Sequence, residues 1–175
     1  MRRIFCQQIF SSPDRILRNT VVEQDNQNKI TNLIAIENQI AETSHTLYCD
    51  GIISSEIISV ALNLETEDIN ITTDFQYVNL NSTNSDKLII PEKKPLLIDF
   101  ESNDLSRINT ILKDKIFLLE NFSIMTIIAA CTFYPNSYLK LSKELKLSHQ
   151  TQLLLWKRFD LTKEGKSSYL QVNLV

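Results

Sequence analysis

The hydrophobic pattern of this 175-residue chain changes its period twice, and this change constrains the fold more than any other feature. In the first half, apolar residues alternate with polar ones or form short runs between turns, which is typical of β-strands. From Leu105 the apolar residues recur with helical spacing, and short apolar runs return at Leu153 and Tyr169. The order of strands, helices and strands predicts an α+β fold in which strands from both ends share a sheet.

The strands expected in the first part of the chain are separated by polar turns. A turn at 11–14 follows the first strand, and a polar loop at 24–29 joins the second and third strands into a hairpin. Asp50-Gly51 is expected to act as a pivot between two further strands. The expected strands are residues 3–10, 16–23, 30–37, 46–49, 52–62, 68–80, 88–90 and 96–100, with closing strands at 153–156 and 169–175.

Two or three helices are expected in the C-terminal half. Residues 102–104 (SND) are a capping signal for the first helix, and Ser123 can cap the second. The second helix is apolar nearly all round, which predicts that it is buried, and Pro135 is expected to end or kink it. The expected helices are residues 105–119, 124–133 and a shorter third piece at 138–147.

Composition excludes several classes of function. The formal net charge is −3, so the chain has no overall positive field that would hold nucleic acid or an anionic membrane. Only two glycines occur, Gly51 and Gly165, and both are isolated. Phosphate-cradling loops and nucleophile elbows need glycines at fixed spacing, so these motif classes are excluded.

Cysteine usage and hydropathy predict a soluble, cytoplasmic protein. Cys6, Cys49 and Cys131 are far apart, odd in number and set among apolar or aromatic neighbours. This is typical of reduced, buried thiols rather than of a disulfide framework or a zinc site. The N-terminus has no signal-peptide pattern, and the longest uncharged run, 121–139, is too polar to span a bilayer.

The stretch DGIISSEIISVALNLE, residues 50–65, resembles the start of the amidohydrolase superfamily of metal-dependent hydrolases. The likeness is to its cytosine deaminase, chlorohydrolase and imidazolonepropionase-like branch. There, N-terminal sandwich strands lead through G-I-I-x-P-G-F-(I/V)-(D/N)-x-H-x-H-L-E into the first barrel strand. Gly51, Ile52 and Ile53 match its beginning and Leu64 and Glu65 its end, without gaps.

The chemistry of that motif is missing from this chain. Ser55 and Glu56 stand where the family has Pro-Gly, and Ser59 stands where it has Asp or Asn. The two metal-binding histidines of the family fall on Ala61 and Asn63, whose side chains cannot ligate a metal as imidazoles do. The resemblance therefore implies that the metal site has been lost.

The C-terminal part is similar to the end of the same family. Residues 127–141, IIAACTFYPNSYLKL, resemble the helix read as L-L-x-A-A-T-x-N-P-A-x-x-L-G-L, and 148–156 stand where the next strand would follow. Residues 97–103, LIDFESN, resemble the end of the last barrel strand, which places Asp99 on the catalytic aspartate. Only about 30 residues separate Glu65 from Leu96, whereas a complete barrel takes about 200 or more.

The resemblance thus implies a composite β-sandwich, built from residues 1–65 and 145–175, with the catalytic barrel largely deleted. Residues 66–144 would be a strand-and-helix remnant packed on it, and no complete TIM barrel is expected. In the parent architecture, the apolar surfaces of 124–133 and 153–156 would pack partly on the barrel. Without it they must be covered by the insert from Glu65 to Pro95 or by another subunit.

The remaining candidate sites are better explained structurally. The two histidines, His45 and His149, lie in polar segments and on no motif position, so no metal or cofactor is expected. Asp99 is interpreted as a carboxylate at a strand end, close to a helix start that favours negative charge. The acidic residues Glu65, Glu67 and Asp68 are interpreted as a solvated turn.

These observations predict a non-catalytic, amidohydrolase-like pseudoenzyme that acts through protein contact. The expected partner is a second copy of the chain, with an active amidohydrolase relative as the other possibility, and neither nucleic acid nor a membrane is expected. One alternative is a small-molecule-binding module with a cleft near Asp99 and Glu101. Others are a hydrolase with a re-invented site and a gene product without a selected role.

Overall fold

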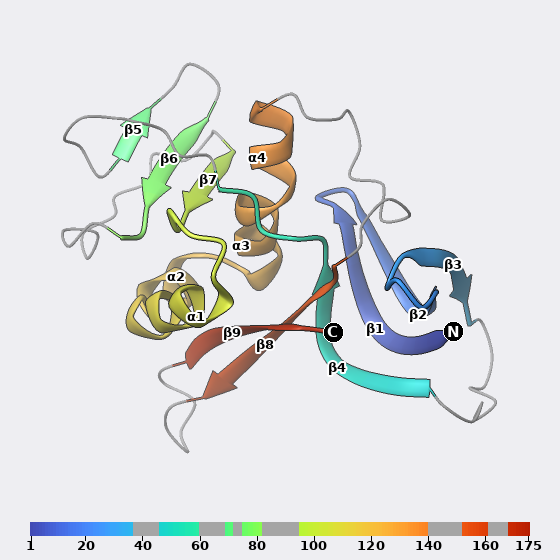
Figure 1. Ribbon diagram of the computed structural model, residues 1–175. Helices are drawn as coiled ribbons and strands as arrows, with labels where there is room; N and C mark the ends of the chain where they lie inside the picture. The colour runs from blue at the N-terminus through green and yellow to red at the C-terminus, as the bar shows by residue number, and fades with distance from the viewer. Residues whose placement is uncertain (37–45, 60–68, 72–74, 82–94, 140–151, 161–167) are drawn as a thin grey trace. The chain divides into compact units, whose positions relative to one another are not determined.

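The computed structural model describes residues 1–36, 46–59, 69–71, 75–81, 95–139, 152–160 and 168–175 (Figure 1). The chain divides into two compact units. The first comprises Met1–Glu56, Glu144–Lys157 and Val172–Val175, and the second comprises Ile57–Lys143 and Arg158–Gln171. Strands dominate the first half and helices follow them, so the predicted α+β class is confirmed, and the described strands form no closed barrel.

A six-stranded sheet joins the two ends of the chain (Figure 1). Its order is β3-β2-β1-β4-β8-β9, so the C-terminal strands extend the N-terminal ones as predicted. Strand β1 pairs antiparallel with β2 and parallel with β4, and β4 pairs antiparallel with β8. The strands are β1 (Arg2–Ser12), β2 (Arg15–Gln24), β3 (Ile30–Ala35), β4 (Thr46–Ser54), β8 (Leu154–Asp160) and β9 (Ser168–Leu174).

One face of this sheet carries the core of the first unit. Strand β1 contributes Ile4, Cys6 and Ile9 to this core, and Phe5 and Phe10 of the same strand are buried as well. The cluster is built from aliphatic side chains and two thiols, and Leu153, beside β8, completes it. Its buried members are Ile4, Cys6, Ile9, Val22, Ile30, Cys49, Ile53 and Leu153.

Strand β4 is continuous where the sequence predicted a pivot. Cys6 lies opposite Cys49 and Gln8 lies opposite Ile52, so two residues of β4, Asp50 and Gly51, face a single residue of β1. This is a β-bulge, and Gly51 takes the backbone angle φ of +143° that side-chain-bearing residues rarely adopt. The pivot prediction was wrong because a bulge absorbs the extra residue without ending the strand.

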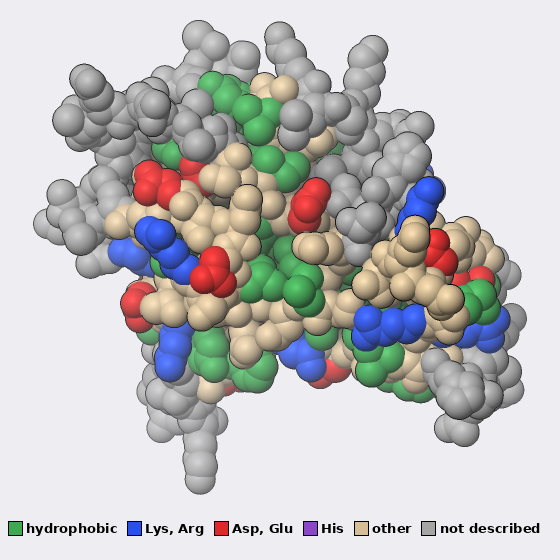
Figure 2. All heavy atoms as spheres, in the orientation of Figure 1, with side chains coloured by type: hydrophobic (Ala, Val, Ile, Leu, Met, Phe, Trp, Pro, Cys, Tyr) green, Lys and Arg blue, Asp and Glu red, His purple; other side chains and the backbone are tan. Residues whose placement is uncertain are grey.

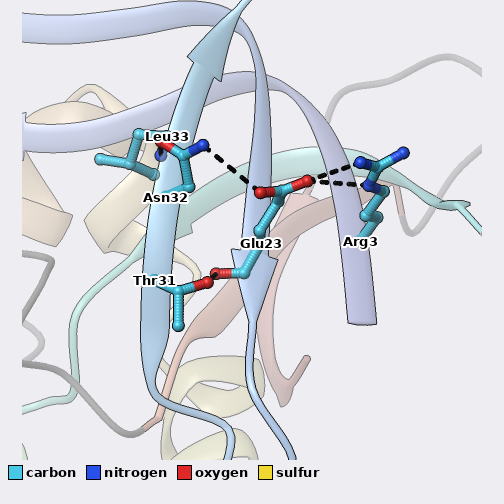
Figure 3. Close-up of polar contacts among 5 residues, drawn as sticks. All are labelled: Arg3, Glu23, Thr31, Asn32 and Leu33. Atoms are coloured by element: carbon cyan, nitrogen blue, oxygen red, sulfur yellow. Dashed lines mark hydrogen bonds and ion pairs between the residues drawn. The ribbon is translucent and has the colours of Figure 1, made fainter. Parts of the chain in front are cut away.

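A buried carboxylate ties the first three strands together on β2 (Figure 3). Glu23 lies opposite Arg3 of β1, whose guanidinium donates to the Glu23 Oε1 atom at 2.8 Å. Asn32 of β3 donates its side-chain amide to Glu23 Oε2 at 3.3 Å, and Thr31 donates its hydroxyl to the Glu23 backbone carbonyl. Charge-assisted bonds of this kind keep a largely buried Glu side chain satisfied.

The second unit contains a small mixed sheet, β5 (Ile69–Ile71), β6 (Gln76–Asn79) and β7 (Leu96–Asp99). Strands β5 and β6 pair antiparallel, whereas β6 and β7 pair parallel. The single strand predicted over 68–80 is therefore two strands, β5 and β6. The prediction missed the break because alternation of apolar and polar residues does not show where a chain reverses direction. The predicted strand at 88–90 lies outside the described residues.

Four helical segments follow β7: α1 (Leu105–Asp114), α2 (Phe117–Asn121), α3 (Ile124–Cys131) and α4 (Phe133–Tyr138). Both predicted caps are confirmed, since Asp104 accepts from the Ser106 backbone N–H and Ser123 accepts from that of Thr126. Helix α3 is buried and packs on β7, as its apolar composition predicts.

The helix ends differ from the prediction. The first predicted helix breaks between Asp114 and Phe117, and the second ends at Cys131. Pro135 lies within the first turn of α4, where a missing backbone N–H costs no helical hydrogen bond. The third predicted helix, 138–147, falls almost wholly outside the described residues.

The distribution of surface charge and the hydropathy of the helices can be compared with the composition. On the face drawn in Figure 2, acidic and basic side chains are interspersed rather than gathered by sign. Within the part of the chain that the structure describes, no helix is long and apolar enough to cross a membrane.

Candidate functional site

Asp99 ends β7 and is fully buried. The whole strand, Leu96–Asp99, is shielded, because α3 and α4 pack against it within the second unit. The parallel neighbour β6 ends beside it, with Asn79 in register with Asp99. Polar side chains at the carboxyl ends of neighbouring parallel strands converge at one edge of a sheet, and ligand sites of α/β proteins form there.

Protein donors surround the Asp99 carboxylate. The Ser59 hydroxyl donates to Oδ1 at 2.8 Å, and the Glu101 backbone N–H donates to the same atom at 2.9 Å. The Tyr77 hydroxyl, on β6, donates to Oδ2 at 2.9 Å. Both carboxylate oxygens are thus bonded inside the protein, which compensates for the desolvation of the charge.

The segment after β4 is held against this carboxylate by two contacts. The Ile58 backbone N–H donates to the Cys131 carbonyl at 3.0 Å, at the end of α3. The next residue, Ser59, then reaches Asp99. The strand pairing and this contact therefore bring together two residues that are 40 positions apart in the chain.

The Cys131 thiol interacts electrostatically with the Asp99 carboxylate. It is fully buried, and burial together with the negative charge of Asp99 raises its pKa well above the ordinary value. The prediction that this thiol is buried is confirmed, and a raised pKa favours its protonated form.

Glu101 forms a second, exposed polar cluster two residues beyond Asp99. The side-chain amides of Asn79 and Asn81 both donate to its carboxylate, the second at 3.2 Å. Asn81 also donates to the Phe100 carbonyl, and Glu101 has a left-handed backbone, with φ of 48°. A left-handed backbone is uncommon outside glycine and is retained where surrounding contacts determine it.

The place of Asp99 at a strand end, before helix α1, is confirmed. Its carboxylate accepts hydrogen bonds from Ser59, Tyr77 and the Glu101 backbone N–H. The side chain that caps α1 is Asp104. Sequence reasoning missed Ser59 and Tyr77 as partners; the only available signal was that a buried tyrosine hydroxyl needs an acceptor.

The other sequence-predicted positions are not placed. Ala61, Asn63, His45 and His149 lie outside the described residues, as does the acidic turn at 65–68. Among the residues that the structure describes, no group of three or more His, Cys, Asp or Glu side chains is arranged to hold a metal ion. The three cysteines are free thiols and all are buried, as predicted.

The chain matches no protein-family model, no curated protein and no solved structure.

Proposed function

We propose that this chain is a non-catalytic, amidohydrolase-like protein that acts through protein contact, with a second copy of itself as partner. The observation that carries the contact is the exposed apolar part of β4 that precedes its pairing with β8. Among the described residues, β8 pairs with β4 over Ile52, Ile53 and Ser54. Before these residues, Leu47 and Tyr48 are 44% and 51% exposed. A strand edge with exposed apolar side chains can be completed by another chain.

A second copy suits this edge because the segment can pair antiparallel with itself. Such pairing places the same residues on both sides of a two-fold axis and closes after two chains. Tyr48 already rests on Phe5, with ring centroids 5.6 Å apart, so its aromatic face is held in place before association. An active amidohydrolase relative is the competing partner.

The state of Asp99 supports the absence of catalysis. In the resemblance this residue would handle a proton on a metal-bound water, yet here its two oxygens accept bonds from Ser59, Tyr77 and the Glu101 backbone. Together with Ala61 and Asn63 on the histidine positions, this argues for a structural carboxylate. Stoichiometric zinc, iron or nickel in the purified protein, or deaminase or amidase turnover, would contradict it.

The proposal also covers the architecture of the chain and its location in the cell. The composite β-sandwich of 1–65 and 145–175, with 66–144 as remnant, is supported by the pairing of β4 with β8. The parallel pair β6 and β7, with Asp99 at its carboxyl end, supports the barrel remnant. Three reduced thiols support a cytoplasmic location.

Light scattering after size-exclusion chromatography tests the self-association. At micromolar concentration we expect a mass of twice 20.2 kDa for the natural chain. Leu47→Lys should give a monomer, because it places a charge on the pairing edge. The matched control is Ile34→Lys, on edge strand β3, where an isoleucine is 39% exposed; it should stay dimeric.

Two results would overturn this proposal. The natural chain could elute as a monomer across the micromolar range. Alternatively, Ile34→Lys could dissociate the dimer while Leu47→Lys leaves it intact. If the chain is a monomer alone but forms a stable complex with a co-expressed amidohydrolase, self-association is rejected and the amidohydrolase is the partner of β4.

A second candidate function is small-molecule binding at the carboxyl ends of β6 and β7. The Glu101 carboxylate is exposed there, and the amides of Asn79 and Asn81 hold it in one orientation. A fixed carboxylate beside amides can recognise ligands that present N–H donors, such as purines, pyrimidines and related amides.

Thermal-shift screening against these compound classes tests the second candidate. A ligand at 100 times its dissociation constant stabilises the native state by about 2.7 kcal/mol, which raises the unfolding temperature measurably. Glu101→Ala should abolish the shift, whereas Glu120→Ala, at an exposed position on α2, should not. An equal shift in both variants would reject this site.

A further inference from the structure

Two thiols lie side by side in the first unit. Cys6 of β1 and Cys49 of β4 are directly opposite each other in the parallel register, 43 positions apart in the chain. Their side chains share the face that carries the core, and the Cys6 thiol donates to the Cys49 carbonyl at 3.9 Å. Both are free cysteines.

The two thiols differ in acidity. The pKa of Cys49 is lowered to about 7, chiefly by the contact with the Cys6 thiol and in smaller part by the positive charges of Arg2 and Lys157, while burial opposes the shift. The same contact and burial raise the pKa of Cys6. Near neutral pH a substantial fraction of Cys49 is therefore thiolate, whereas Cys6 is protonated.

We propose that Cys6 and Cys49 form a reversible oxidation site that reacts with small hydroperoxides and closes to an intrachain disulfide. The inference goes beyond the proposed function, because it uses neither the exposed side chains of β4 nor the Asp99 site. It rests on the register, the shared face and the contact between the two residues.

The chemistry balances with the hydroperoxide as the only oxidant. The Cys49 thiolate attacks one peroxide oxygen and the O–O bond breaks; with hydrogen peroxide, hydroxide leaves and Cys49 becomes a sulfenic acid. The Cys6 sulfur then attacks the Cys49 sulfur, giving up its proton as the S–O bond breaks, and water leaves. In total two thiols and one hydrogen peroxide give one disulfide and two waters.

The backbone permits this bridge with little movement. Neighbouring strands lie about 4.8 Å apart, within the range of about 4.4–6.8 Å between the Cα atoms of disulfides. The register shift between Cys6 and Gln8 adds local freedom beside the pair. A disulfide between directly opposite residues of neighbouring strands is strained, and a strained disulfide is reduced more easily than an unstrained one. We therefore expect the disulfide to be reversible.

Peptide mapping tests the proposal, with Cys131 as an internal control. The reduced protein is treated with hydrogen peroxide at neutral pH, alkylated and digested with trypsin. We expect the peptides 4–15 and 30–87 to become linked and to separate again with dithiothreitol. Cys131, in peptide 116–140, should react at least roughly tenfold more slowly than Cys49, because its pKa is raised whereas that of Cys49 is lowered.

Two variants separate the steps. In Cys6→Ser, Cys49 should stop at the sulfenic acid, which dimedone traps; in Cys49→Ser, Cys6 should stay reduced. The proposal is overturned if the natural chain forms no link between the two peptides, if Cys131 oxidises as fast as Cys49, or if the link joins Cys49 residues of two chains. The measurement on the natural chain does not depend on the folding of either variant.

Discussion

Asp99 shows at the residue scale how burial and bonding determine the role of a side chain. A fully buried carboxylate costs several kcal/mol unless donors surround it, and here Ser59, Tyr77 and the Glu101 backbone provide them. The resemblance alone would make this residue a proton-handling group. Its contacts connect β7 with β6 and with the segment after β4 within the second unit.

Removing one donor should therefore destabilise the protein. Tyr77→Phe leaves the Asp99 Oδ2 atom without this hydroxyl, and we expect a loss of about 1–3 kcal/mol in the free energy of unfolding. Urea denaturation measures it, with Tyr48→Phe as the control at a half-exposed tyrosine. Equal stability of both variants would show that the Asp99 contact contributes nothing.

The reactivity of Cys49 should depend on Cys6. Alkylation requires the thiolate, so the rate at Cys49 should rise as pH increases through about 7. Cys6→Ala removes the main cause of the lowered pKa, and the midpoint should move upward toward the ordinary value of 9.0. Mass spectrometry of iodoacetamide adducts follows the rate, and an unchanged midpoint in Cys6→Ala would contradict this cause.

Gly51 allows the bulge of β4 for a steric reason as well as for its backbone angle. A Cβ atom at this position would lie 2.5 Å from the Trp156 carbonyl oxygen and 2.9 Å from a Leu155 methyl carbon. We expect Gly51→Ala to lower the free energy of unfolding by about 2 kcal/mol or more, since backbone must move to accept it. A loss no greater than that of an exposed control, Arg15→Ala on β2, would argue against the clash.

At the element scale, the pairing of β4 with β8 joins the two ends of the chain. Ile52 lies opposite Trp156 and Ser54 opposite Leu154. The Trp156 indole N–H donates to the Ser54 hydroxyl at 2.8 Å, and both residues are buried. The hydroxyl in turn donates to the Ser55 carbonyl, so each polar hydrogen at this junction has an acceptor.

Ser54→Ala should weaken this junction. The buried indole N–H would lose its acceptor, which costs about 1–3 kcal/mol. Trp156 is the only tryptophan, so its fluorescence reports directly on this strand pair during urea unfolding. Ser102→Ala, in the loop before α1, serves as the control and should leave the unfolding midpoint unchanged. Equal midpoints for the two variants would mean that the indole bond adds no stability.

At the scale of the whole molecule, the proposed dimer makes stability depend on concentration. Association stabilises the native state by mass action, so the unfolding temperature of the natural chain should rise with protein concentration. Leu47→Lys should remove that dependence, whereas Ile34→Lys should keep it. Differential scanning calorimetry over a range of concentrations measures it, and a temperature that does not vary for the natural chain would contradict the dimer.

Much of the local structure could be predicted from the sequence. Alternating apolar residues predicted β1 to β3, and the capping residues Asp104 and Ser123 predicted where helices α1 and α3 begin. These features depend on neighbours a few positions away. The ends of helices and the division of 68–80 into β5 and β6 were missed, because they depend on packing partners that the local pattern does not contain.

The amino-acid pattern alone predicts the class of the fold, the burial of the thiols and the lack of glycine-rich or histidine-rich motifs. Which side chains meet is known from the folded chain only. Ser59 and Asp99 are 40 positions apart, Cys6 and Cys49 are 43 apart, and Trp156 reaches Ser54 across 102. Such contacts follow from strand register and order, and these are set by the burial of a whole sheet face rather than by any short segment.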